Sequence, residues 1–136
     1  MALDAYSRTV VAVARQVTPH VASVQTRRGG GSAVVVSGDG YLLTNAHVVE
    51  SARAGTVEFA DGSAAPFDVT GVDPLSDLAV LYARGDAPDA ATLGDADRLV
   101  VGQLVVAVGS GARRPRRPCR STPRRSGPHR GPRGNP

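Results

Sequence analysis

Residues 33–45, AVVVSGDGYLLTN, decide the fold of this chain. Two apolar, strand-like runs flank an Asp-Gly turn, which is a strong local signal for a β-hairpin. The hairpin continues into 44–49, TNAHVV, and so places His47 at the end of a strand. A lone histidine in that place is either a catalytic base or an ordinary strand-end residue. Other segments of the sequence are needed to choose between these two interpretations.

Similar short runs occur on both sides of the hairpin and predict further strands. Residues 56–60 alternate with a period of two, with Val57 and Phe59 on one face. Residues 77–82, DLAVLY, are apolar enough for burial on both faces. Residues 27–32, RRGGGS, are predicted to be a flexible loop. The predicted strands are 21–26, 33–37, 41–45, 56–60, 67–73, 77–82 and the end of 93–109.

These six or seven strands, closely spaced by turns, indicate an all-β fold, a small antiparallel barrel or sandwich. A short amphipathic helix is predicted before them, at 4–17, with its apolar residues at helical spacing. Asp4 is its expected N-cap, and Pro19 is expected to stop it. We therefore expect an N-terminal helix over 1–20 and a barrel over 21–112.

The charges separate the barrel from a basic tail. Residues 1–112 hold seven of the sixteen arginines and all twelve acids, a net charge of −5, whereas 113–136 hold nine arginines and no acid. The tail has no Val, Ile, Leu, Phe or Tyr and is rich in proline, so we expect it to be disordered. The single Cys119 cannot form an intramolecular disulfide. No signal peptide or membrane segment is visible, and no cofactor or metal site is expected.

Four segments in order resemble one family: the N-terminal helix, 29–49, 71–81 (GVDPLSDLAVL) and 93–110 (LGDADRLVVGQLVVAVGS). Together they resemble the HtrA (Deg) family of trypsin-like serine proteases, over residues 5–110. The resemblance implies the N-terminal barrel of a two-barrel fold, whose catalytic triad lies between the barrels. It also implies proteolysis of the kind used in protein quality control, on unfolded or peptide substrates, by a family that is often extracytoplasmic.

By this resemblance, His47 is the general base and Asp77 is the carboxylate that orients it. A serine hydroxyl needs a base to accept its proton, and imidazole suits that task near neutral pH. Taken without the family motifs, Asp77 has an alternative role as a cap of the turn DPLSD (73–77). Asp39, Asp61 and Asp73 lie in turn sequences and are expected to be structural. His20 is expected to be packed or solvated, and His129 has no motif.

No nucleophile of the family type, Gly-Asn-Ser-Gly-Gly-Pro, occurs in this chain. The nearest imitation is Ser126-Gly127-Pro128, which follows arginines and lies too close to Asp77 in sequence for the strands that should precede it. A His/Asp pair without a nucleophile is expected to be inactive alone. We hypothesise that a frameshift in GC-rich DNA truncated a longer protease and produced the tail.

Two other functions stay open at this point. One is a non-catalytic interaction module, which self-associates through the face that a second barrel would cover. The other is binding of nucleic acid through the arginine-rich tail. Nucleic acid is the less favoured partner, because the tail has no aromatic residues for base stacking and the barrel is acidic.

Overall fold

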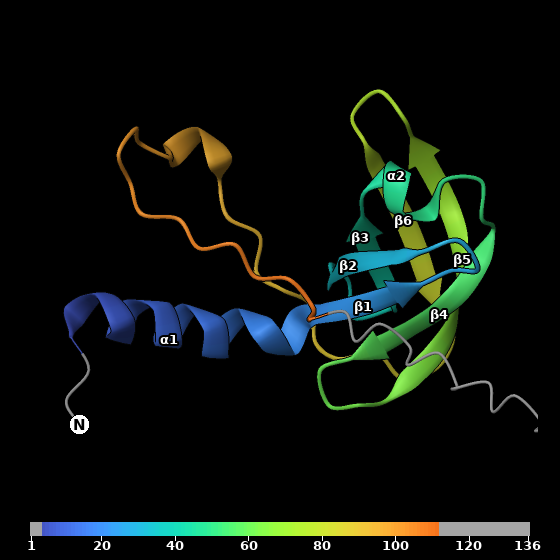
Figure 1. Ribbon diagram of the computed structural model, residues 1–136, viewed down its shortest axis with the longest axis horizontal. Coiled ribbons are helices and arrows are strands. Elements are labelled where there is room, and N and C mark those ends of the chain that lie inside the picture. Colours follow the sequence, from blue (N-terminus) through green and yellow to red (C-terminus); the bar gives the residue numbers. More distant parts are fainter. Residues whose placement is uncertain (1–3, 112–136) are drawn as a thin grey trace, which may run out of the picture.

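Six antiparallel strands close into a barrel in the order β1-β2-β3-β6-β5-β4 (Figure 1). This computed structural model describes residues 4–111, so the predicted disordered tail at 113–136 lies outside the described residues. The predicted all-β antiparallel barrel with an N-terminal helix is confirmed. The strands are β1 (Val21–Gln25), β2 (Gly30–Val35), β3 (Tyr41–Thr44), β4 (Ala54–Phe59), β5 (Ala64–Asp73) and β6 (Leu78–Ala83).

Two Asp-Gly turns connect neighbouring strands as the sequence predicts. Gly40 and Gly62 have φ angles of 100° and 87°, a region that favours glycine. The Asp61 carboxylate accepts hydrogen bonds from the backbone and hydroxyl of Ser63, and Asp39 lies in a turn that the Ser37 hydroxyl bridges. Both aspartates are therefore structural, as expected.

The core consists of the alternate residues that point into the barrel. Val57 and Phe59 are buried and Glu58 is exposed, which confirms the period-two pattern of β4. The prediction that β6 is buried on both faces is wrong, since Leu78 and Tyr82 are exposed on its outer face. On this outer face the ring of Tyr82 lies 5.2 Å from that of Tyr41. The largest fully buried side chains are Phe67, Leu42, Leu81, Val24, Val35, Val49 and Val57.

The glycine-rich segment 27–32 is not all loop, which corrects the prediction. Gly30 and Gly31 belong to β2 and pair with Gln25 and Val24. A Cβ on Gly30 would lie 2.5 Å from the Val24 carbonyl oxygen, and one on Gly31 would lie 2.7 Å from a methyl carbon of Val48. Close approach of neighbouring groups, rather than flexibility, therefore explains these glycines.

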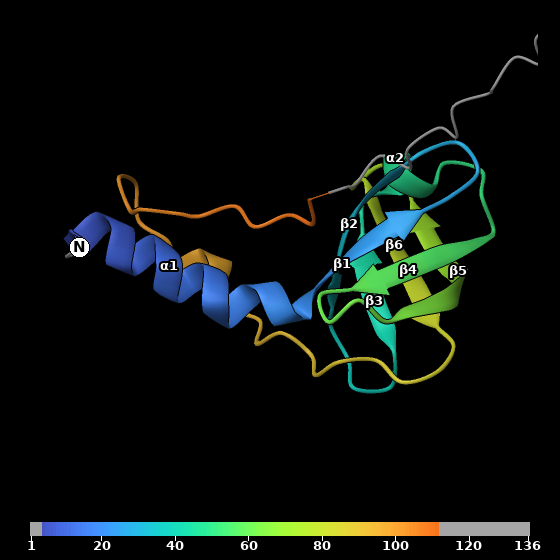
Figure 2. The ribbon, with the colours of Figure 1, turned by 60° about the horizontal axis from the view of Figure 1, so that its bottom comes forward.

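The N-terminal helix α1 (Ala5–Val17) forms as predicted. The Asp4 carboxylate accepts the Ser7 backbone N–H at 2.7 Å, and a short 3-10 helix, η1 (Thr18–His20), containing Pro19 ends it. α1 has no buried residue and extends away from the barrel (Figure 2). Its apolar stripe is at most half-buried.

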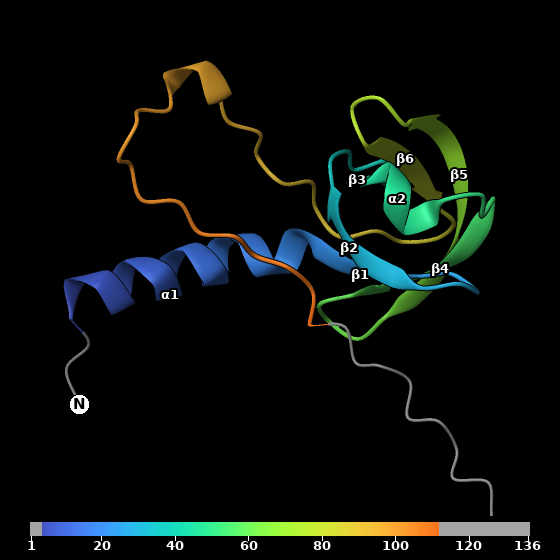
Figure 3. The same cartoon turned by 45° about the horizontal axis from the view of Figure 1, so that its top comes forward.

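Residues 92–111, which we call the arm, leave the barrel and return to it (Figure 3). The arm contains one short 3-10 helix, η2 (Ala96–Arg98), and no strand. The buried strand predicted at the end of 93–109 is therefore wrong within the described residues. The physical reason is that no free strand edge lies beside it, so its backbone has no ladder to join and its large side chains stay in solvent. The exposed ones are Leu93, Leu99, Val100, Val101, Leu104 and Val105.

Candidate active site

His47 lies on a one-turn helix, α2 (Ala46–Val49), which follows β3 directly. The sequence prediction placed this histidine at a strand end and missed the helix. Ala46 and Val49 are buried and fix α2 against the barrel, whereas the His47 side chain is 71% exposed. Val48 packs where Gly31 leaves room for it. The barrel therefore holds the backbone of His47 and presents its ring to solvent.

Asp77 ends the turn between β5 and β6, at the same end of the barrel as α2. That turn is held by Asp73, whose carboxylate accepts the Leu75 backbone N–H at 3.1 Å and the Ser76 hydroxyl at 2.8 Å. Asp73 is therefore structural, as expected, and it makes the bonds that the alternative interpretation assigned to Asp77. The carboxylate of Asp77 is directed to α2 instead.

The Asp77 carboxylate contacts His47 twice. Its Oδ2 lies 2.7 Å from Nδ1 of the ring, and its Oδ1 accepts the His47 backbone N–H at 2.9 Å. In return, the side-chain amide of Asn45 donates to the Asp77 backbone carbonyl at 3.0 Å. Two residues that are thirty positions apart in the sequence are thus held in one bidentate arrangement.

The electrostatics of the pair follow from these bonds. The His47 backbone N–H and then the His47 side chain lower the pKa of Asp77 below its ordinary value of 3.8, so the carboxylate is ionised near neutral pH. An ionised carboxylate can only accept hydrogen bonds, so Nδ1 of a neutral His47 must carry the ring proton. Nε2 then holds a free lone pair, and this arrangement can accept a proton from a hydroxyl.

The surroundings of the ring are open. A hollow of 110 Å³ lies beside it, lined by the β1–β2 connection, including Thr26 and Arg28, and by Val48 and Glu50 of the α2 region. Within residues 4–111, no hydrogen bond joins His47 to a serine. Ser110, in the arm, instead donates its backbone N–H to the Ser32 hydroxyl at 2.9 Å. The described residues therefore bring a histidine and an aspartate together but place no serine in hydrogen-bonding contact with the histidine.

The other candidate residues are placed elsewhere. His20 is half-buried, and its Nδ1 lies 2.6 Å from the Asp89 carbonyl oxygen, so it is packed as expected. Ser126, His129 and Cys119 lie outside the described residues. Sequence reasoning missed Asn45, although an asparagine directly before a helical turn is a recognisable N-cap signal that could have drawn attention to it.

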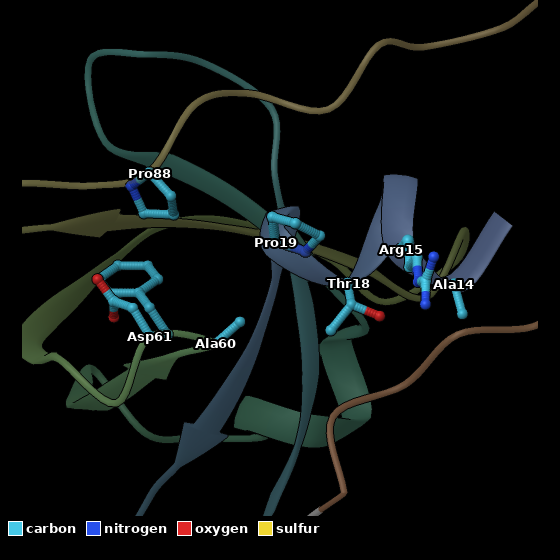
Figure 4. Close-up of a pocket in the computed structure, with 8 residues that line it drawn as sticks. Ala14, Arg15, Thr18, Pro19, Ala60, Asp61 and Pro88 are labelled. Atoms are coloured by element: carbon cyan, nitrogen blue, oxygen red, sulfur yellow. The ribbon is translucent and has the colours of Figure 1, made fainter. Parts of the chain in front are cut away.

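A larger hollow, of 590 Å³, is lined by Thr18 and Pro19, just before β1 (Figure 4), whereas the hollow beside His47 is lined by Thr26, just after β1. The end of α1, the β4–β5 turn and Pro88 also line the larger hollow, and Arg15 and Asp61 are its charged residues. No cluster of His, Cys, Asp or Glu that could hold a metal ion occurs among residues 4–111. None of the helices in the same range has the length and apolar character that a membrane span requires.

Comparison with known proteins finds trypsin-like serine proteases among the relatives of this chain. A profile of the trypsin-like peptidase domain matches residues 31–135, and so extends beyond Ser110, where the motif resemblance stops. The chain is 44% identical over 86 residues to a probable periplasmic serine endoprotease, DegP-like, from Halomonas elongata, covering 63% of this chain and 18% of that protein. It is 39% identical over 116 residues to the serine protease PepD from Mycobacterium tuberculosis, covering 75% and 25%.

Solved structures with a similar fold include HtrA-type proteases. The chain superimposes on Deg5 with a TM-score of 0.67 and 27% identity, covering 74% of this chain and 55% of Deg5. It superimposes on the HtrA-type protease AlgW, determined with a tripeptide, with a TM-score of 0.62 and 36% identity, covering 67% of this chain and 31% of AlgW. The chain thus spans a quarter or less of the length of the two curated relatives described above.

Proposed function

Because the chain belongs to the trypsin-like peptidase family, as a partial HtrA/DegP-like serine protease domain, we propose that His47 and Asp77 are the base and orienting carboxylate of its proteolytic triad. The observation that carries this proposal is the 2.7 Å contact between His47 Nδ1 and Asp77 Oδ2, made at an exposed end of the barrel. An exposed base is able to meet a hydroxyl from another part of a protease domain.

In this mechanism the free lone pair on Nε2 accepts the proton of a serine hydroxyl as its oxygen attacks a peptide carbonyl carbon. The imidazolium that forms is stabilised by the Asp77 carboxylate, which stays ionised because its pKa is lowered by the His47 backbone and ring. Nε2 then returns the proton to the leaving amine when the carbon–nitrogen bond breaks.

This chain is proposed to be inactive by itself. The sequence has no Gly-Asn-Ser-Gly-Gly segment, and the described residues place no serine in hydrogen-bonding contact with His47. A triad acts as a unit, so a base without its nucleophile gives almost no hydrolysis. The substrate class we propose for the completed site is an unfolded chain or peptide, in line with the tripeptide bound to AlgW.

A hydrolysis assay tests the proposed inactivity. The full chain and its His47→Ala variant are each incubated with casein or a fluorogenic peptide, and neither is expected to release product above background. Activity in the parent chain that disappears in the variant would contradict the proposed inactivity.

The role proposed for His47 is tested by adding a second protein that carries a serine nucleophile. The chain is mixed with a separately produced C-terminal half of the PepD protease domain, and binding is checked by size-exclusion chromatography. Hydrolysis is expected in the mixture and is expected to be lost with His47→Ala. A bound complex that hydrolyses nothing would contradict the assignment of His47.

A second function is favoured by one observation, the exposed apolar side chains of the arm. Leu99, Val101 and Val105 are each more than half exposed, and exposed apolar side chains favour association. Self-association through the arm is therefore the alternative to catalysis. Light scattering over a range of protein concentrations tests it, and a monomer at every concentration would exclude it.

A further inference from the structure

We propose that Asn45 is a positioning residue, which sets the geometry of the His47–Asp77 pair by holding the backbone of Asp77. The inference rests on the roles proposed for His47 and Asp77, and it names a third residue that those roles require. It is carried by the 3.0 Å hydrogen bond from the Asn45 amide to the Asp77 carbonyl oxygen.

The position of Asn45 makes this bond unexpected. Asn45 is the N-cap residue of α2 and has the extended backbone that an N-cap adopts, with φ −85° and ψ 146°. An N-cap asparagine ordinarily accepts a backbone N–H of its own helix, yet the Asn45 side chain makes no such bond. The N–H of His47 is accepted by Asp77 Oδ1 instead. The Asn45 side chain thus bonds to the backbone of Asp77, and the Asp77 side chain accepts the N–H that an N-cap asparagine would ordinarily accept.

The bond also continues the contact between β3 and β6 beyond their last backbone pair. β3 and β6 pair up to Thr44 and Ala79, so Asn45 and Leu78 are the next positions along the same ladder. There the backbone of β3 turns into α2 and leaves the sheet, and the Asn45 side chain reaches across to the neighbouring residue, Asp77. The Asn45 amide therefore ties the turn that carries Asp77 to the strand that leads into His47.

Asp77 needs such a restraint because its backbone is left-handed, with φ 54°. Non-glycine residues adopt this conformation uncommonly, and although aspartate does so more often than most, it costs free energy that contacts such as the Asn45 bond offset. The carboxylate and the carbonyl of Asp77 leave the same Cα, so fixing the carbonyl limits where the carboxylate can lie. Without the Asn45 amide, we expect the turn to relax and Oδ2 to separate from Nδ1.

Asn45 is exposed, so its replacement leaves no cavity in the core. Three variants separate the proposed donor role from helix capping. Asn45→Ala removes the donor and the potential cap, Asn45→Ser keeps a neutral capping hydroxyl on a shorter side chain, and Asn45→Asp keeps the shape and capping ability but cannot donate. Ser76→Ala is the matched control, because it removes a hydrogen bond to Asp73 within the same turn but none to Asp77.

The readout is the ¹⁵N chemical shifts of the His47 ring in the full chain, at a pH where the ring is neutral. In the parent chain the shifts are expected to show one tautomer, with the proton on Nδ1. In all three Asn45 variants the two nitrogens are expected to shift toward a mixture of tautomers, while the amide spectrum of the barrel is unchanged. In Ser76→Ala the single tautomer is expected to persist.

Three results would overturn the inference. They are an unchanged tautomer in the Asn45 variants, an equal shift in Ser76→Ala, and loss of the folded barrel in all three variants, which would make Asn45 a structural residue only. A parent chain that already shows mixed tautomers would contradict the proposed function itself. A single tautomer that does not depend on Asn45 would contradict this inference alone.

Discussion

The barrel, residues 21–83, and the arm, residues 92–111, have similar compositions and opposite environments. Val24, Val35 and Leu42 of the barrel have no exposed surface, whereas Leu99 and Val105 of the arm are 58% and 70% exposed. Both segments contain valine-rich runs that predict strands. The difference is that every barrel strand has a neighbour on each side, and the arm has none.

This comparison shows that strand propensity needs a free strand edge to be realised. A β-branched run fits a pleated, half-buried surface, and without a neighbouring strand its backbone groups are satisfied by water instead. Among the described residues, hydrogen bonds join this segment to the barrel only at its two ends: the Ala91 backbone N–H, just before the arm, donates to the Val35 carbonyl, and the Ser110 backbone N–H donates to the Ser32 hydroxyl. The following predictions test how far the two regions differ.

The largest difference is expected from truncation of matched leucines. Leu42→Ala removes a fully buried side chain and is expected to lower the free energy of unfolding by about 2–5 kcal/mol, through lost burial and a residual cavity. Leu99→Ala, in the arm, is expected to change it by less than about 0.5 kcal/mol. Chemical denaturation measures both. Equal losses would show that the arm is packed in solution.

A smaller difference is expected from adding a methyl group to a glycine. Gly31→Ala places a Cβ 2.7 Å from a Val48 methyl carbon and is expected to destabilise the barrel by about 1–3 kcal/mol. Gly94→Ala, in the arm, has no atom within 4 Å of its Cβ and is expected to change stability by less than about 0.5 kcal/mol. Thermal unfolding compares them, and a neutral Gly31→Ala would contradict the close packing of α2 on β2.

Removal of the arm is expected to have a modest effect on stability and a clear effect on association. A chain ending at residue 92 loses the hydrogen bonds between Ser110 and Ser32, so its free energy of unfolding should fall by about 1–2 kcal/mol relative to a chain ending at residue 112. The shorter chain is expected to associate less, because it lacks the exposed leucines and valines of the arm. Sedimentation of both chains measures this, and equal association would place the contact on the barrel.

The smallest effect is expected from the pH dependence of Asp77. Since folding lowers the pKa of Asp77, its contribution to stability is present above the ordinary value of 3.8 and is lost as the pH falls through the lowered value. The difference in unfolding free energy between the parent chain and Asp77→Asn should therefore shrink below pH 3.8. Asp86→Asn, in the segment between barrel and arm, is the control for the change in net charge, and an equal shrinkage in that variant would contradict an effect specific to Asp77.

Much of the fold could be predicted from local sequence. The Asp-Gly turns, the alternation of Val57 and Phe59 and the Asp4 cap are local patterns, and each corresponds to one element of the structure. The errors share a cause, which is dependence on neighbours distant in sequence. The sequence predicts a loop at Gly31, whereas in the structure Val48 lies against this strand residue. The sequence also predicts a strand in the arm, whereas in the structure the arm has no partner strand and forms none.

The candidate site, like the fold, could be predicted from the sequence only in part. His47 and Asp77 were singled out by motifs that resemble a known family, before any geometry was available. That resemblance could not reveal that Asp77 holds α2 by its backbone as well as by the ring, or that Asn45 bonds to Asp77 and not to its own helix. Hydrogen bonds across thirty positions depend on how β3 and β6 pair.

The sequence by itself determined most of the strands and the turns between them, because these depend on local periodicity and residue chemistry, and the resemblance of its motifs to a known family pointed to His47 and Asp77. Only the tertiary structure decided which apolar runs are buried, that His47 lies on a helical turn, and that Asn45, His47 and Asp77 hold one another. The physical reason is that burial and long-range hydrogen bonds depend on partners, and partners are brought together only when the barrel closes.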